Sequence, residues 1–257
     1  MDYYTKNDWK DTFESCGIRR GFQVLLQLNE TLGSETAGGI LTILEALMEV
    51  VTETGLIMVP AFTDTALDPA SVHVPACSYE NWAGYRRSLT GYDPGVSLCP
   101  QTAMLLQRIP GARRTEHPAF SFVIWGTAQP ETLRQPLDFP VSFEPALAFF
   151  DEPMSCCLLL GRPWQESLLL QAVAHLTGQE IVSIQKAWLH RPKRNLAKSY
   201  LTGKPDPDKL GEILELIQCE ERMTLTGPVC VMSLYSPSWK TLEIWKISRD
   251  SKKSQQN

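Results

Sequence analysis

Histidines beside carboxylates are the first candidates for chemistry in this sequence, because imidazole exchanges a proton near neutral pH. His117 directly follows Glu116 and precedes a proline and an apolar segment. A histidine paired with a carboxylate can serve as a general base, so we take His117 and Glu116 as catalytic candidates. The alternative interpretation is a turn histidine that hydrogen-bonds the backbone.

Residues 156–175 contain an apolar run, a Gly-Arg-Pro turn and a second apolar run. The pattern predicts a strand, a turn and a helix, an arrangement that often carries a catalytic residue just after the strand. The turn and the first helical turns offer only weak candidates, none of them a base at neutral pH: Trp164, Gln165, Ser167 and Gln171. His175 lies at the end of the predicted helix, where a protonated imidazole would also interact favourably with the helix dipole.

Four further groups of residues have both a chemical and a plainer interpretation. Gly38 and Gly39 begin a predicted helix and either present backbone N–H groups to an anion or form a tight turn. Cys77 or Cys99 could form a nucleophilic pair with His117, although no specific signature supports it. The loop acids either hold a polycation or serve solubility; they are Asp64, Asp68, Glu80 and Asp93. The basic run around His190 is a solvated face or a contact for a cofactor phosphate.

Composition narrows the partners. The 257-residue chain has a net charge of −5, which argues against nucleic acid and is compatible with a small cationic partner. Its seven cysteines form no CxxC pair, so we predict no metal site. No phosphate-binding or nucleotide-binding glycine motif occurs either. Without a signal peptide or an apolar run of about 20 residues, the sequence predicts a reduced, cytoplasmic protein.

Periodicity predicts alternating strands and helices. Predicted strands cover residues 24–28, 56–59, 120–125, 157–160, 181–184 and 229–234, and predicted helices cover 5–16, 40–51, 102–108, 167–175, 208–217 and a segment from 236. Strand, helix and strand in succession form a βαβ unit, which implies parallel strands. We therefore expect an α/β fold, with a central mostly parallel or mixed sheet flanked by helices. It forms one domain over residues 1–247, and residues 248–257 form a disordered polar tail. Residues 61–114 are expected to be largely irregular and 130–140 to form a loop, and the basic stretch 186–204 is expected to end in a turn.

Several blocks, in order and spacing, resemble the acetyl-CoA-dependent aminoglycoside 3-N-acetyltransferases. They are residues 21–62, 92–94, 110–122, 158–161 and 227–229, so the resemblance extends from about residue 17 to 247. The resemblance implies acetyl-CoA as cofactor, a small cationic amine of the aminoglycoside type as substrate, and a role in antibiotic resistance. It implies that a histidine, assisted by a carboxylate, removes a proton from the attacking amine. We take Asn29, Gly38, Gly39 and Ser97 as the cofactor-binding candidates.

The departures from the family pattern concern its active residues. The family's His-Ser-Ser after the first strand corresponds to residues 28–30, which include Asn29 and Glu30, and its Ser-Pro corresponds to Glu144-Pro145. The catalytic histidine aligns with Gln171 and the nearby acid with Ala174. A glutamine cannot accept a proton at neutral pH, and loss of a general base removes about 10²–10⁴-fold of rate. Two functions follow: a divergent N-acetyltransferase, with His175 as a relocated base, or a non-catalytic relative that binds a ligand or a protein.

Overall fold

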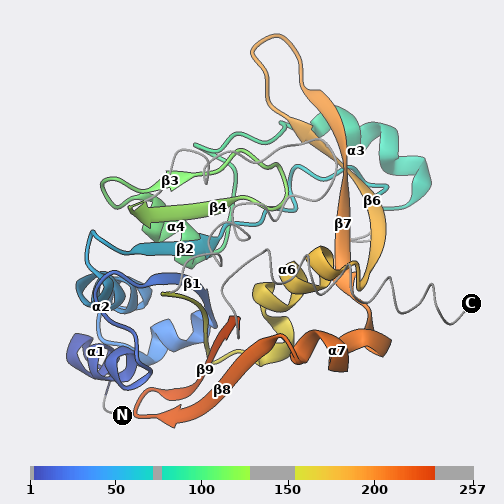
Figure 1. Cartoon of the computed structure of the whole chain (residues 1–257). Coiled ribbons are helices and arrows are strands. Elements are labelled where there is room, and N and C mark those ends of the chain that lie inside the picture. The colour runs from blue at the N-terminus through green and yellow to red at the C-terminus, as the bar shows by residue number, and fades with distance from the viewer. Residues whose placement is uncertain (1–2, 72–76, 128–153, 235–257) are drawn as a thin grey trace, which may run out of the picture.

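The structure, a computed structural model, describes residues 3–71, 77–127 and 154–234. Its centre is a seven-stranded mixed sheet in the order β3-β4-β2-β1-β5-β9-β8, which confirms the predicted fold class (Figure 1). The strands are β1 (Gln23–Leu28), β2 (Leu56–Pro60), β3 (Arg113–Arg114), β4 (Phe122–Gly126), β5 (Ser155–Leu160), β6 (Glu180–Leu189), β7 (Leu196–Pro205), β8 (Ile217–Thr224) and β9 (Gly227–Leu234). The α-helices are α1 (Lys6–Ser15), α2 (Ile40–Val51), α3 (Trp82–Ser88), α4 (Gln101–Gln107), α6 (Leu168–Thr177) and α7 (Leu210–Leu214). Short 3-10 turns are η1 (Glu30–Glu35), η2 (Tyr79–Asn81), η4 (Trp164–Glu166) and η5 (Pro207–Lys209).

The parallel part of the sheet is its middle. β1 pairs in parallel with β2 on one side and with β5 on the other, whereas the outer strands are antiparallel. Strands β1 and β5 are buried over five of their six residues, on both faces of the sheet. Such nearly continuous apolar strands require helices on both faces, as parallel sheets generally do.

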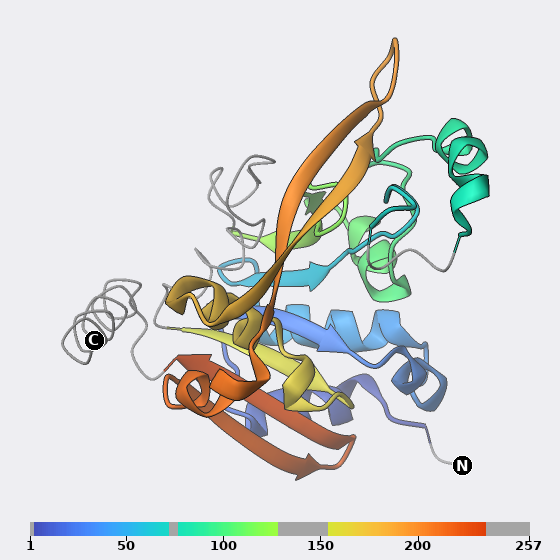
Figure 2. The ribbon, with the colours of Figure 1, turned by 90° about the vertical axis from the view of Figure 1, so that its right-hand side faces the viewer.

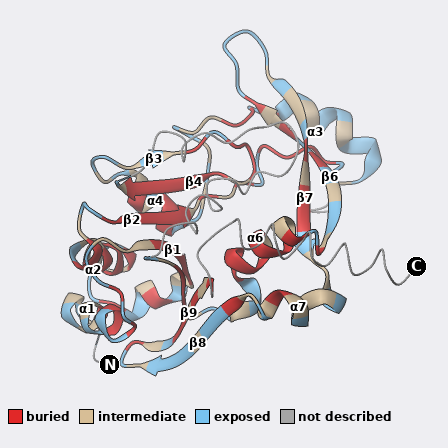
Figure 3. Ribbon diagram, in the orientation of Figure 1, coloured by how far each residue is buried: buried red, intermediate tan, exposed pale blue. Residues whose placement is uncertain are grey.

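Helices cover the sheet in two layers. One core cluster joins the sheet to α1, α2 and α4, and a second joins its other face to α6 and α7. Figure 3 shows the central strands buried between these layers, while much of β8 is exposed. Helix α1 begins in a capping box, in which Thr5 and Asp8 each satisfy the other's backbone N–H. The predicted helices near residues 5–16, 40–51, 102–108 and 167–175 are confirmed.

The long β6–β7 hairpin differs from the sequence prediction. The sequence predicted a strand only at 181–184, followed by a basic stretch at 186–204 that ends in a turn, yet β6 and β7 pair along ten residues each, from Glu180 opposite Pro205 to Leu189 opposite Leu196. Figure 2 shows this ribbon crossing the molecule beside the main sheet. Its sequence alternates exposed charged residues with buried ones such as Ala187 and Tyr200. That alternation is the mark of a half-buried strand, and the high charge concealed it.

Two more predictions were wrong. The helix predicted at 208–217 is shorter, being α7 at Leu210–Leu214, because Ile217 already begins β8, which pairs with β9 along eight residues. Helix α3 lies within a stretch predicted to be irregular. The predicted loop at 130–140, the helix from 236 and the tail at 248–257 lie outside the described residues. No helix among the described residues is long and apolar enough to cross a membrane.

A buried ion pair attaches the long loop after β2 to the hairpin. The carboxylate of Asp68 is 1% exposed and accepts hydrogen bonds from Arg86 Nε and Nη2 at 2.9 and 2.8 Å and from Trp188 Nε1 at 3.2 Å. Burial alone would raise the pKa of Asp68, but these bonds and one from the Ala70 backbone more than offset it and lower the pKa to about 2. The loop, α3 and β6 are therefore held together by one ionised carboxylate.

Candidate active site

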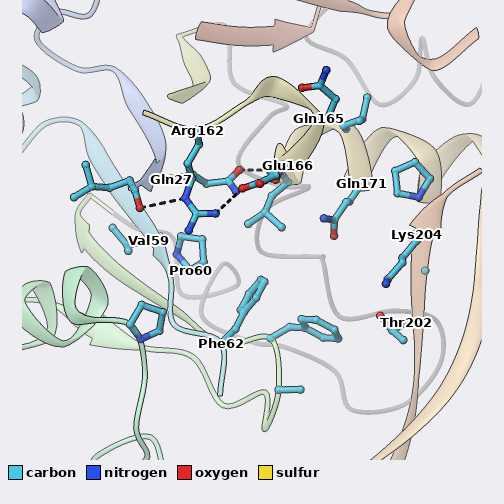
Figure 4. Close-up of a pocket in the computed structure, with 18 of the residues that line it drawn as sticks. Gln27, Val59, Pro60, Phe62, Arg162, Gln165, Glu166, Gln171, Thr202 and Lys204 are labelled. Carbon is cyan, nitrogen blue, oxygen red and sulfur yellow. Dashed lines mark hydrogen bonds and ion pairs between the residues drawn. The ribbon is translucent and has the colours of Figure 1, made fainter. Parts of the chain in front are cut away.

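A pocket of about 1260 Å³ opens at the carboxyl ends of the parallel strands. One side consists of the ends of β1 and β2 and the turn before α6, and the other consists of the β6–β7 hairpin (Figure 4). Ligand pockets are typically about 300–1,000 Å³, so this one has room for an extended ligand or for two ligands. The lining includes Gln27, Asn29, Glu30, Phe62, Asp64, Phe120, Arg162, Glu166, Gln171, Gln185, Thr202, Gly203 and Lys204.

Gln27 on β1 fixes the start of α6. Its side chain is 8% exposed, and its Oε1 accepts from Leu168 N at 2.8 Å and from Cys157 Sγ at 3.3 Å. Its Nε2 donates to the Glu166 carbonyl at 3.0 Å. Ser167 caps the helix by accepting from Leu169 N at 3.2 Å. A buried glutamine in an apolar strand thus holds the turn from which α6 carries Gln171 into the pocket (Figure 4).

The carboxylates nearest β1 are already bonded. Glu30 Oε1 accepts from Thr102 N at 2.8 Å and from Thr102 Oγ1 at 3.0 Å, so it meets the N-terminus of α4. Arg162 Nη1 contacts Glu166 Oε2 at 2.9 Å, and its Nε donates to the Leu28 carbonyl at 3.2 Å. Glu166 is therefore paired with a cation, and Glu30 is hydrogen-bonded at the start of α4.

Asp64 and Lys204 differ from these bonded groups. Both line the pocket and are exposed, and neither has a side-chain hydrogen bond or ion pair with another described residue. Figure 4 shows Lys204 and Gln171 both pointing into the pocket. The pocket thus offers one free carboxylate for a cation and one free ammonium for an anion.

The structure places His117 outside the pocket lining. Its side chain is 0% exposed, and its Nδ1 accepts from Ala119 N at 3.1 Å and from Phe120 N at 2.9 Å. Burial lowers the pKa of His117 to about 3, so the ring is neutral at pH 7. Glu116 is exposed and does not line the pocket. This geometry favours the interpretation of His117 as a turn histidine.

His175 is bonded to a carboxylate behind the pocket wall. Its Nδ1 lies 2.7 Å from Glu180 Oε1, and the two side chains are 15% and 7% exposed. Glu180 packs directly behind Gly203, where a Cβ would clash with its carboxylate, and Gly203 lines the pocket. Gln171, one helical turn earlier, lines the pocket, whereas His175 does not. The pair has the form of an oriented imidazole, but neither His175 nor Glu180 is among the residues that line the pocket.

The candidates for cofactor binding do not converge. Asn29 lines the pocket, where its Oδ1 accepts from Thr31 N at 3.2 Å and its Nδ2 donates to the Gly161 carbonyl at 3.3 Å. Gly38 and Gly39 have φ values of 84° and 73°, and neither lines the pocket. A Cβ on Gly38 would clash with the Thr42 hydroxyl, so the tight turn accounts for it.

Ser97 and the cysteines also lie apart from the lining. Ser97 closes a loop turn, where its Oγ accepts from Asp93 N at 2.9 Å. Cys77 and Cys99 are partly buried, and burial raises the pKa of Cys99, which disfavours a thiolate nucleophile. Sequence reasoning missed Gln27, Arg162, Gln185 and Lys204, which line the pocket. The alternation of buried and exposed residues could have indicated Gln185 and Lys204, but not Gln27 and Arg162.

Known proteins with similar sequences belong to one family. A family model described as aminoglycoside 3-N-acetyltransferase matches residues 30–224. The SPbeta prophage-derived aminoglycoside N(3')-acetyltransferase-like protein YokD of Bacillus subtilis (strain 168) is 26% identical over 258 residues, covering 96% of this chain and 94% of that protein. Aminoglycoside N(3)-acetyltransferase IX of Micromonospora chalcea is 28% identical over 203 residues, covering 74% of this chain and 69% of that protein.

Solved structures share the fold. The crystal structure of YokD from Bacillus subtilis matches with a TM-score of 0.79 and 22% identity, covering 98% of this chain and 96% of that one. AAC-IIIb in a binary complex with CoASH matches with a TM-score of 0.73 and 18% identity, covering 96% and 97% of the two chains. AAC-VIa bound to sisomicin matches with a TM-score of 0.69 and 16% identity, covering 96% and 98%.

Proposed function

Because the chain belongs to the aminoglycoside 3-N-acetyltransferase family, we propose that it binds an acyl-CoA and a small cationic amine in this pocket and acylates the amine nitrogen. The observation that carries the proposal is the pocket itself, at the carboxyl ends of β1, β2 and β5. Trp164, in the turn before α6, packs against the second core cluster and is not among the residues that line the pocket. The described residues thus leave room for both ligands.

The charges of the lining fit an acyl-CoA, whose phosphates require positive partners. Lys204 has no ion pair with another described residue, and Arg162 adds a second positive charge next to Glu166. Glu30 replaces a family residue near the cofactor, but its carboxylate accepts two hydrogen bonds from Thr102 at the start of α4. Lys204, Arg162 and Asn29 are therefore the side chains expected to hold the ligand. When bound, an acyl-CoA supplies an activated acyl group as a thioester.

Asp64 and Gln171 are the side chains that we assign to the amine. Asp64 attracts the cationic amine through its free carboxylate. Gln171 can orient a ligand through its amide but cannot take up a proton at neutral pH. The described lining contains no histidine. In this proposal the proton of the attacking amine leaves to solvent. Catalysis then rests on positioning the two ligands.

A second function is favoured by the same residue. Gln171 and Ala174 stand where the family's histidine and acid align, so a relative that binds the ligands without turnover is the alternative. Release of thiol from acetyl-CoA, assayed with aminoglycosides and simple amines, tests acylation. Isothermal titration calorimetry with acetyl-CoA tests binding alone. Turnover supports the first function, binding without turnover supports the second, and the absence of both contradicts both.

The cellular setting forms part of the proposal. All seven cysteines are free thiols, which suits a reducing cytoplasm where acyl-CoA is made. If the acceptor is an aminoglycoside, the protein confers antibiotic resistance. Expression in a susceptible host should then raise the minimum inhibitory concentration of that compound, and an unchanged value with a good in vitro acceptor would contradict this role.

A further inference from the structure

Gln185 of β6 lies on the hairpin side of the pocket. It lines the pocket, yet its side chain belongs to the core, being only 2% exposed. Its Oε1 accepts a hydrogen bond of 2.7 Å from the hydroxyl of Tyr200, the residue opposite it on β7. Its Nε2 is buried and has no hydrogen-bond partner among the described residues.

The orientation of this amide is fixed by Tyr200. The ring of Tyr200 stands edge-on to His117 at 4.9 Å and to Phe120 at 5.9 Å, and burial raises the pKa of Tyr200 strongly. The hydroxyl therefore stays protonated and donates to Oε1. A flipped amide would turn its NH₂ group toward this donor and leave the hydroxyl proton without its acceptor. The unpartnered group of Gln185 is thus a donor.

A buried N–H without a partner destabilises a fold, so proteins rarely retain one that nothing satisfies. The partner must accept a hydrogen bond. An ammonium group has no acceptor, and a carboxylate facing a single amide would lose much of its hydration without adequate compensation. A neutral oxygen, as in a hydroxyl or carbonyl group, satisfies the donor at low cost.

We propose that Gln185 is a specificity-determining residue, which donates from Nε2 to a neutral oxygen of the acceptor amine. The inference rests on the proposed function, because it assumes that an amine occupies this pocket. The site then selects amines that carry a hydroxyl or carbonyl group over purely hydrocarbon amines of the same size. Thr202, 5% exposed and on the same side of the pocket, adds a second polar group nearby.

The test compares cyclohexylamine with the 2-, 3- and 4-aminocyclohexanols, which differ from it by one hydroxyl group. Calorimetry should show that the native protein binds at least one aminocyclohexanol about tenfold more tightly than cyclohexylamine, the usual effect of one hydrogen bond. The double variant Gln185→Met with Tyr200→Phe removes both partners of the hydrogen bond between these side chains, so no buried hydroxyl is left without an acceptor. The affinity ratio should then fall to about one.

Tyr200→Phe alone is the matched control, because it keeps the Gln185 amide, which can bond a ligand hydroxyl in either orientation, and it should keep the preference for the hydroxylated amine. If the double variant does not fold, Gln185→Asn withdraws the donor by one methylene and should reduce the ratio. An unchanged ratio in the variant that folds, or no preference or binding in the native protein, would overturn the proposal. Thiol release is measured separately, so failure of acyl transfer leaves this binding test intact.

Discussion

Substitutions of His117 distinguish a catalytic role of this residue from a structural one. Its Nδ1 accepts two backbone N–H groups, from Ala119 and Phe120, at a position that is 0% exposed. We predict that His117→Asn is tolerated better than His117→Ala, because the Asn Oδ1 can occupy nearly the position of the imidazole Nδ1. Both variants lose the ring contact with Tyr200, so their difference reports the acceptor alone.

The magnitude follows from the two bonds. Each buried N–H left without a partner costs about 1–3 kcal/mol, so the alanine variant should be about 2–6 kcal/mol less stable than the asparagine variant. The lost ring contact should cost both variants a further amount, about 0.5–1.5 kcal/mol. Urea unfolding at pH 7.5 measures the difference as a shift in the midpoint at constant slope.

The pH dependence provides a second measurement. The pKa of His117 is about 3 in the fold and about 6.5 in an unfolded chain, so below pH 6.5 the unfolded state binds a proton that the native state does not. The stability associated with neutral His117 is fully present above pH 6.5 and is lost as the pH falls toward 3. In His117→Asn this dependence should disappear between pH 6.5 and about 4. Equal losses in both variants, or a folded His117→Asn that no longer transfers acyl groups, would refute the structural assignment.

Three further predictions follow from other contacts. With acyl transfer established, the rate should rise with pH in proportion to the unprotonated amine, and His175→Gln should lower it less than tenfold; a loss of about 100-fold or more in this variant would make His175 the base. Asp68→Asn should cost about 2 kcal/mol in urea unfolding at pH 7, because its pKa is lowered from 3.8 to about 2, and the loss should vanish as the pH falls from 4 to 2. An Asp68→Asn variant as stable as the native protein would show that Arg86 contributes nothing. Cys219 Sγ and Cys230 Sγ lie 3.5 Å apart, so diamide should join them with loss of two hydrogen atoms in the mass spectrum, and Cys219→Ser should abolish the product; an unchanged native mass would contradict the pairing.

Local patterns sufficed for the centre of the fold. The apolar runs of β1, β2 and β5, and the amphipathic face of α2, are buried whatever surrounds them, so periodicity located them within a residue or two. The βαβ order then implied the parallel pairing of β1 with β2 that the structure has. Mixed sheets need only such local rules at their centre, where both faces are covered.

The site was less predictable, because its main side chains are polar groups that only tertiary structure buries. Gln27 and Gln185 are 8% and 2% exposed, yet residue type alone does not distinguish them from surface glutamines. His117 attracted attention through its neighbour Glu116, whereas its environment is set by Tyr200, far along the chain. Residue type identified chemical capacity, but the pairing of β6 with β7 decided which groups face the pocket.

The two sides of the pocket come from structurally separate sources. The end of β1 and the turn before α6 are locked to each other through Gln27, so a substitution there disturbs several elements together. Gln185, Thr202 and Lys204 instead project from a two-stranded ribbon that is not part of the main sheet. Natural variation can therefore change this ribbon, and with it the preferred amine, while the opposite side is preserved. Relatives of this chain should diverge faster along the hairpin than along β1, and their ligand preferences should follow the hairpin.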